Sequence, residues 1–117
     1  MGQGSQMIRR ITADEVAPHI GVAAGDDLDF ILREVRAGIS QAYALDSAHI
    51  VTRAEGSELV VVCFEGRGLR AGAEFIISRA REAGLKSVRY HTAHRWVEKI
   101  VADLGFVEVE RVHRVMI

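Results

Sequence analysis

The chain has 117 residues, 49% of them hydrophobic, and its 15 Lys and Arg residues against 16 Asp and Glu residues give a formal net charge of −1. This length predicts one domain with its own core, and the near-neutral charge disfavours a nucleic-acid partner, which a strongly basic surface would attract. Because the sequence has a single cysteine, Cys63, no apolar run of the ~18 residues that a membrane span needs and no signal-peptide pattern, we expect a cytoplasmic domain with no membrane partner.

The chain opens with a β-prone run followed by a helix start. Residues 1–6 read as a disordered leader or tag remnant, so a single domain is expected to span residues 7–117. The run from Met7 to Ile11 is β-prone. Thr12 and Glu15 match a capping box, in which each side chain accepts a hydrogen bond from the other residue's backbone N–H. A helix is therefore predicted to begin after Thr12.

A proline and two aspartates divide the next stretch. Pro18 lies too deep for an unbroken helix, which predicts that the first helix is short or kinked. Asp26 or Asp27 is the expected N-cap of a second helix. The apolar face of that helix is predicted from residues at helical spacing, namely Leu28, Ile31, Leu32, Val35, Ile39 and Ala42.

Strands then follow one another before the next helix. They are predicted at about Ala42–Leu45 and His49–Arg53 and, after a turn at Gly56, at Glu58–Phe64. The helix that comes next ends at Gly84. Its apolar face is expected to comprise Ala73, Ile76, Ile77, Ala80 and Ala83.

The remainder of the chain alternates between strand and helix. Lys86 to Thr92 is predicted as a strand, Gly105 as the end of a helix, and the alternating residues from 107 onward as a final strand. The apolar stripe of the helix is Ala93, Trp96, Val97, Ile100, Val101 and Leu104. Strands in direct succession predict antiparallel neighbours, whereas strand–helix–strand units predict parallel ones, so a mixed sheet is expected.

The loop after the strand that ends at Phe64 is rich in Gly and Arg, and it opens a helix. The first N–H groups of a helix lack acceptors within the helix, and Arg67 and Arg70 add positive charge beside them. This combination is typical of an anion site, most often one for phosphate. The alternative is a plain strand-to-helix turn in which Gly66 and Gly68 supply a positive φ.

The order of elements and two motifs resemble the GNAT N-acetyltransferase superfamily. Val62 is followed by Arg67-Gly68-Leu69-Arg70-Ala71-Gly72, which is similar to the family pattern R-G-x-G-x-G. Downstream, Ala102-Asp103-Leu104-Gly105-Phe106 resembles the family's "E-K-L-G-F" helix end. The resemblance covers about residues 39–117. It implies an α+β fold, an α/β/α sandwich of the acyl-CoA N-acyltransferase type with a mixed sheet and helices on both faces.

The resemblance also implies a chemistry. Acetyl-CoA would be the cosubstrate, an amine the acceptor, and the loop amides would hold the pyrophosphate. The implied cofactor-binding residues are Cys63, Phe64, Arg67, Gly68, Leu69, Arg70, Ala71 and Gly72. Two departures stand against activity: Arg70 replaces the central glycine, and Val101 lies where the family often has a tyrosine that acts as the general acid.

Two residues are candidates for proton transfer. Glu65 could deprotonate the incoming amine, although a solvated strand end is the alternative interpretation. His94 occupies the position of a family asparagine and could act as a proton donor or as a polar pocket residue. His91 and His94 alone do not provide the three or four ligands that a zinc site needs, so no metal is expected.

A second function remains open from the sequence. The departures from the family pattern also fit a catalytically inactive GNAT-like binding or assembly protein, encoded by a phage or mobile element. The chain ends too soon after Phe106 to form both of the family's last strands. An unpaired sheet edge would follow, and it predicts a homodimer formed by strand pairing.

Overall fold

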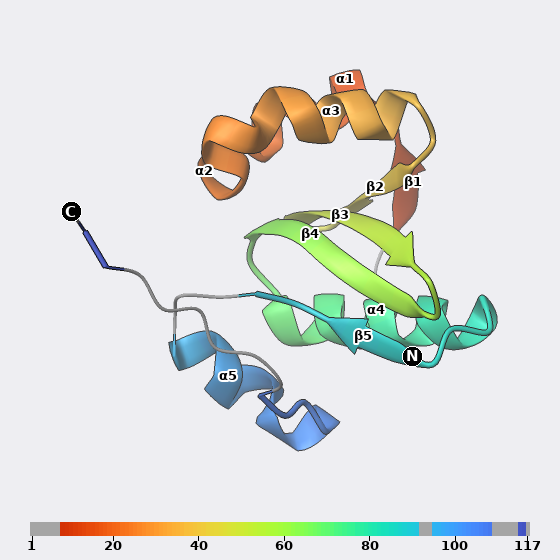
Figure 1. Cartoon of the computed structure of the whole chain (residues 1–117), viewed down its shortest axis with the longest axis vertical. Coiled ribbons are helices and arrows are strands. Elements are labelled where there is room, and N and C mark those ends of the chain that lie inside the picture. Colours follow the sequence, from red (N-terminus) through yellow and green to blue (C-terminus); the bar gives the residue numbers. More distant parts are fainter. Residues whose placement is uncertain (1–7, 92–94, 109–114, 117) are drawn as a thin grey trace.

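A computed structural model describes residues 8–91, 95–108 and 115–116 of the chain. It contains a five-stranded sheet whose strands lie in sequence order. The first four strands are antiparallel neighbours, and the fifth runs parallel to the fourth, as Figure 1 shows. This confirms the mixed sheet predicted from the sequence. The strands are β1 (Arg9–Ile11), β2 (Ser40–Leu45), β3 (Ala48–Glu55), β4 (Glu58–Gly66) and β5 (Ser87–Arg89).

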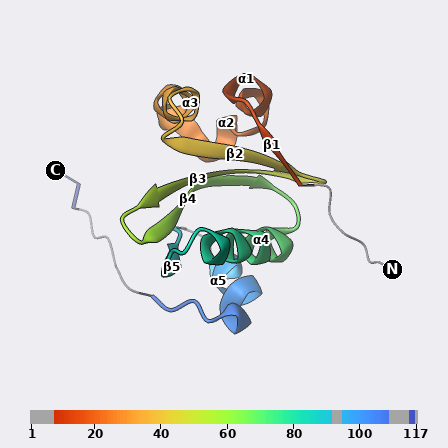
Figure 2. The same cartoon turned by 90° about the vertical axis from the view of Figure 1, so that its right-hand side faces the viewer.

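Helices cover both faces of this sheet, as the resemblance implied (Figure 2). The first part of the chain forms the layer above the sheet in Figure 1, and the part after β4 forms the layer below it. The upper helices are α1 (Ala13–Val16), α2 (Gly21–Ala24) and α3 (Leu28–Arg36), and the lower helices are α4 (Leu69–Glu82) and α5 (Arg95–Val101). Short 3₁₀ turns η1 (Ala17–His19), η2 (Gly25–Asp27) and η3 (Ala102–Leu104) join or extend them.

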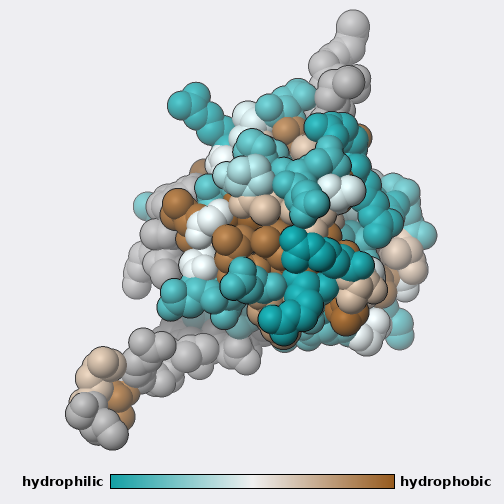
Figure 3. All heavy atoms as spheres, turned by 90° about the horizontal axis from the view of Figure 1, so that it is seen from above, coloured by the Kyte–Doolittle hydropathy of each residue, from teal (hydrophilic) through white to brown (hydrophobic). Residues whose placement is uncertain are grey.

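Each face of the sheet has its own apolar core, because successive strand residues point to opposite sides. Above the sheet, the upper helices pack on one set of strand residues, which includes Val51 and Cys63. Below it, Ile76 and Ala80 of α4 pack on the other set, which includes Ile50. Figure 3 looks onto the upper layer from above and shows apolar atoms surrounded by polar ones. Val22 and Phe30 are among the exposed apolar side chains of α2 and α3.

The predicted start of the first helix is confirmed in detail. The Glu15 N–H donates to the Thr12 hydroxyl at 3.2 Å, and the Thr12 N–H donates to the Glu15 carboxylate at 3.0 Å, which completes the capping box. Pro18 ends this helix after one turn, and the chain continues as the 3₁₀ turn η1. The short first helix therefore follows directly from the sequence.

The second predicted helix needs two corrections. Asp27 occupies the N-cap position of α3, but its side chain makes no capping hydrogen bond, because the preceding residues already form the 3₁₀ turn η2. The helix also ends at Arg36, so Ile39 is 54% exposed and Ala42 belongs to β2. Gly38, with φ +79°, lies between them and breaks the helical repeat.

The C-terminal elements are shorter than predicted. β5 ends at Arg89, and Gly105 ends η3 with φ +93°. Residues 106–108 are not in a strand, and residues 109–114 of the predicted final strand lie outside the described residues, as does the leader 1–6. None of the helices in the described part of the chain is long and apolar enough to cross a membrane.

Candidate cofactor site

Strands β4 and β5 lie side by side for only part of their length. Glu58, Leu59 and Val60 pair with Ser87, Val88 and Arg89, after which β5 ends while β4 continues to Gly66. Figure 1 shows the two segments diverging toward the start of α4. Within the described residues, the second half of β4 therefore has an edge without a strand partner. Open backbone N–H and C=O groups at such an edge can bind an extended molecule.

A β-bulge lies at the beginning of this open edge. Val51 of β3 pairs with Cys63 and Thr52 pairs with Val61, which leaves Val62 as an extra residue on β4. A bulge bends its strand and increases the local twist. It therefore contributes to the separation of β4 from the line of β5.

The loop from β4 to α4 is held close to the β2–β3 turn. The Arg67 N–H donates to the Ser47 carbonyl at 2.8 Å. Gly66 adopts φ +124° beside the same carbonyl, and Gly68 precedes α4 in the left-handed conformation with φ +79°. The positive φ values fit the turn interpretation of these glycines. The family resemblance implied that the loop amides bind phosphate, but the Arg67 amide already donates to a carbonyl within the protein.

The first turn of α4 still provides backbone donors at the open edge of β4. Its first intrahelical bond runs from the Gly72 N–H to the Gly68 carbonyl at 2.9 Å. The N–H groups of Leu69, Arg70 and Ala71 precede that bond and have no acceptor within the helix. The helix dipole adds partial positive charge at the same place. This end of α4 can therefore bind an anion.

The two arginines of the loop differ in their surroundings. Arg67 is exposed and forms no ion pair with any residue that the structure describes. Arg70 is paired with Glu74 at 3.4 Å and with Asp103 of η3 at 2.5 Å. Of the two, Arg67 therefore keeps a positive charge that no other described residue neutralises, beside the first turn of α4.

The other predicted cofactor residues lie on either side of β4. Cys63 faces the upper core, and burial raises the pKa of its thiol to about 11, so it is a protonated apolar residue. Phe64 faces the lower core and lies against Gly72, where an added Cβ would come within 2.6 Å of the ring. Gly72 thus permits α4 to pack closely on the sheet. Because both side chains face a core, Cys63 and Phe64 can contribute only backbone groups to the open edge of β4.

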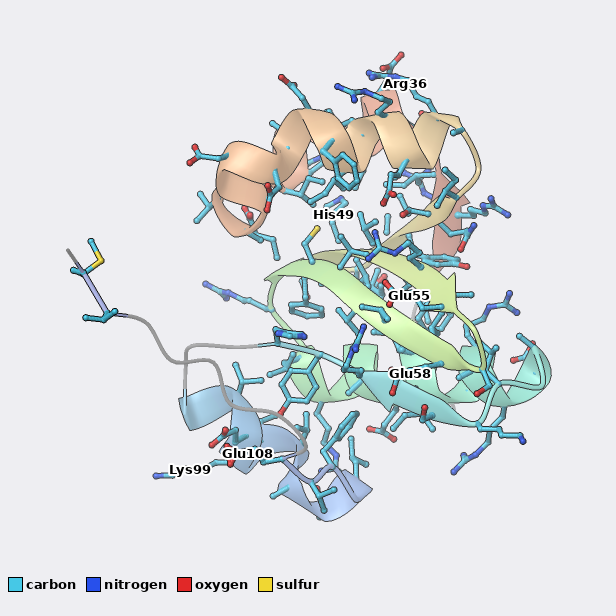
Figure 4. The ribbon with its side chains drawn as sticks, in the orientation of Figure 1. Arg36, His49, Glu55, Glu58, Lys99 and Glu108 are labelled. Carbon is cyan, nitrogen blue, oxygen red and sulfur yellow. The ribbon has the colours of Figure 1, made fainter. Side chains whose placement is uncertain are left out.

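Glu65 serves a structural purpose on the upper face. Its carboxylate accepts a hydrogen bond from the Ala23 N–H at 2.7 Å, which caps the short helix α2. On the neighbouring strand it lies opposite His49, whose ring stacks on His19 at 3.9 Å between centroids. Figure 4 shows His49 between the sheet and the helices above it. His94, the other predicted catalytic residue, lies outside the described residues.

A network of charged residues that the sequence did not predict lies at the paired end of β4 and β5. Arg53 of β3 bonds to Glu34 of α3 at 2.7 Å and also to Glu55. Arg89 of β5 joins Glu55 at 2.9 Å and approaches Glu58 at 3.6 Å. Glu55 and Glu58 are labelled in Figure 4. Arg53 and Glu55 lie two residues apart in β3, but Glu34, Glu58 and Arg89 come from three other elements, so no local spacing in the sequence indicates that the network forms. Within the described residues, no group of side chains could hold a metal ion.

The stacked histidines predict a pH dependence of stability. Burial lowers the pKa of His49, the nearby His19 and Arg9 lower it further, and Glu65 opposes them by raising it. An unfolded histidine has a pKa of ~6.5, so the unfolded chain binds a proton before the folded one does. The stabilising contribution is present above pH ~6.5 and is lost as the pH falls through the lower folded pKa. We expect the melting temperature to fall between about pH 7 and pH 5.

This dependence can be measured by thermal unfolding across that pH range, with His49→Gln as the comparison. The variant keeps a polar side chain but does not titrate, so its melting temperature should depend less on pH. Glu15, Glu55 and Asp103 have carboxyl pKa values that are lowered in the fold, so these groups affect stability only at pH values below this range. Equal pH slopes for both proteins would contradict the prediction.

Comparisons with known proteins bear on the fold. Neither a scan against protein-family models nor a search of curated proteins finds a match. Among solved structures, the chain is similar to an IAA acetyltransferase from Bacillus cereus ATCC 14579, with a TM-score of 0.71 and 14% identity over 91% of this chain and 79% of that one. It is also similar to AAC(6')-Iy in complex with the bisubstrate analog CoA-S-monomethyl-acetylneamine, with a TM-score of 0.66 and 14% identity over 97% and 98% of the two chains.

A third likeness is to a predicted acetyltransferase with acetyl-CoA from Clostridium acetobutylicum. Its TM-score is 0.67 and its identity 6%, and the match covers 96% of both chains. Each of these likenesses extends over most of the chain, although few residues are identical. This chain therefore has the fold of the GNAT N-acetyltransferases, as its sequence motifs implied.

Proposed function

We propose that this protein is an acetyl-CoA-dependent N-acetyltransferase that acts on an amine in the cytoplasm. The observation that carries the proposal is the separation of β4 from β5, which leaves an open strand edge leading to the N-terminus of α4. Two of the structural neighbours are described with acetyl-CoA or with a CoA-based bisubstrate analog.

The residues at the open edge of β4 and the first turn of α4 fit the chemical groups of acetyl-CoA. A pyrophosphate needs clustered N–H donors and positive charge, which the first turn of α4 and the Arg67 guanidinium provide. A pantetheine arm carries amides, which the unpaired edge of β4 can hydrogen-bond. In this arrangement Arg67, Gly68, Leu69, Arg70 and Ala71 bind the phosphates. Cys63 and Phe64 contribute backbone groups, and Gly72 lets the helix approach the strand.

Acetyl-CoA supplies an activated acyl group, a thioester, when it is bound. In the proposed reaction the amine nitrogen bonds to the thioester carbon, the carbon–sulfur bond breaks, and the proton lost by the amine balances the departing thiolate. Backbone N–H groups near the bulge at Val62 would stabilise negative charge on the carbonyl oxygen. Glu65 and His94 remain the proposed groups for proton transfer. The Glu65 carboxylate would act through the oxygen that does not accept the Ala23 N–H.

Binding of acetyl-CoA, measured by isothermal titration calorimetry, tests this proposal. We expect submillimolar affinity in the wild type and a loss of about tenfold in Arg67→Ala, because a hydrogen bond to a charged group contributes about 1.5–3 kcal/mol. Arg81→Ala is the matched control, since Arg81 is an exposed arginine at the other end of α4. An absence of binding at millimolar acetyl-CoA, or equal losses in both variants, would refute the proposal.

An inactive binding or assembly protein is the second candidate, favoured by one observation. Val101, at the position where the family often has a tyrosine acid, is only 2% exposed and has no group that can donate a proton. Acetyl-CoA binding without release of free thiol over a panel of primary amines would favour this candidate. The homodimer predicted from the sequence is compatible with either of these two functions.

A further inference from the structure

The cation at the position of the family's central glycine already has partners within the protein. The Arg70 guanidinium contacts Asp103 through a terminal nitrogen at 2.5 Å and Glu74 through Nε at 3.4 Å. Glu74 lies one turn further along α4, whereas Asp103 belongs to η3, 33 residues away in sequence. The Asp103 contact therefore connects the first turn of α4 to the segment that follows α5.

Asp103 brings a negative charge to a part of the molecule that otherwise attracts anions. Arg70 lies in the first turn of α4, between the donor groups of Leu69 and Ala71. It is close in sequence to Arg67, which pairs with none of the described residues. Its hydrogen bond lowers the pKa of the Asp103 carboxyl group, so this group is ionised at neutral pH. A phosphate at the helix end would compete with Asp103 for Arg70 and would also be repelled by the freed carboxylate.

Replacing Asp103 and Glu74 by a phosphate as the partners of Arg70 should cost little free energy. The side chains of Arg70, Glu74 and Asp103 are 45%, 57% and 67% exposed, and ion pairs between such exposed groups contribute little to stability. A phosphate offers several charged oxygens, and arginine can bind two of them at once. The Arg70–Asp103 pair is weakened by water and salt. A phosphate at the helix end would contact Arg70 and also accept hydrogen bonds from the free N–H groups of the first turn.

We propose that Asp103 is an internal counter-ion of the phosphate-binding turn, which holds Arg70 in the free protein and releases it to a phosphate group of CoA. This inference rests on the proposed function, and it gives Arg70 a role where the family pattern has a glycine. Asp103 lowers the affinity for CoA, because binding must first break the Arg70–Asp103 pair. The same residue favours release of CoA after transfer, because it recaptures Arg70.

The direction of the effect of Asp103→Asn tests the proposal. With CoA itself as the probe, calorimetry at low ionic strength should show about threefold to tenfold tighter binding than in the wild type. In the Arg70→Gln background, the Asp103→Asn change should have a smaller effect, since the competition for Arg70 is gone and only the repulsion between the carboxylate and the phosphate remains. Glu82→Gln is the matched control: it removes one negative charge from the far end of α4, where Glu82 pairs with Arg79 at 3.2 Å.

The possible outcomes separate the two proposals. If Asp103 only anchored η3, its substitution would weaken CoA binding or leave it unchanged, and either result in a wild type that binds CoA overturns the counter-ion role. An equal gain in Glu82→Gln, or a full gain in the Arg70→Gln background, also overturns it. If neither the wild type nor Asp103→Asn binds CoA at millimolar concentration, the proposed function fails and this inference fails with it.

Discussion

Replacing Gly66 with alanine is expected to destabilise the fold by roughly 3–5 kcal/mol, a large part of the ~5–15 kcal/mol that such domains possess. A Cβ at this position would lie 2.3 Å from the Ser47 carbonyl oxygen and 2.6 Å from the Ala48 Cα. Both atoms belong to the backbone, so no side-chain rotation relieves the contact. The φ of +124° adds a conformational cost for any residue with a Cβ. The Arg67–Ser47 hydrogen bond would be disturbed as well.

Urea unfolding of this variant should be compared with that of Gly84→Ala. Gly84 also has a positive φ of +75°, but an added Cβ there meets nothing within 4 Å. Its substitution therefore measures the cost of the backbone conformation alone, about 1–2 kcal/mol. A Gly66→Ala protein that loses no more stability than Gly84→Ala would contradict the close contact with the β2–β3 turn.

The second large effect is expected for Arg53→Ala, at about 2 kcal/mol, or roughly 8 °C in melting temperature. Arg53 and Glu34 have side chains that are only 26% and 15% exposed, so removal of the guanidinium leaves a half-buried carboxylate without its partner. Glu34 also accepts a hydrogen bond from the Ser40 hydroxyl, which would compensate only in part. The expected loss lies below the ~3–5 kcal/mol of fully buried pairs because water still reaches this network.

Arg36→Ala provides the comparison for this prediction. Arg36 is in the same helix as Glu34 and pairs with Asp14, but the two side chains are 58% and 88% exposed. Loss of such a pair should cost between ~0 and ~1 kcal/mol. Thermal and urea unfolding would distinguish the two variants. Similar losses in both would show that burial does not strengthen the Arg53 network.

Local signals in the sequence predicted most of the fold. The Thr12 capping box, the break at Pro18 and the mixed sheet all follow from short-range spacing and the order of elements, and the structure shows them. The exact helix ends were less predictable. Ile39 continued the helical repeat of apolar residues, yet the chain had already turned at Gly38 to begin β2.

The site was only partly predictable, for a physical reason. Sequence order places the Gly/Arg loop at the end of an apolar strand and the start of a helix, and the structure agrees. Contacts between distant segments gave no such signal. Nothing near Arg70 in the sequence indicates that Asp103 would pair with it, and nothing near Glu65 indicates that Ala23 would donate to it. The open edge of β4 depends on a bulge at Val62 and on the early end of β5, which no motif specifies.

Because Glu65 caps α2, this helix depends on a part of the chain that is synthesised much later. This helix has four residues, far fewer than the ~12 that an isolated helix needs for even marginal stability in water. The carboxylate that caps it is 42 residues further along the chain, and the ring on which the preceding His19 stacks belongs to β3. During synthesis, the first part of the chain therefore exists before the hairpin that supports it. Helix α2 therefore has no cap until Glu65 has been synthesised and β4 has formed.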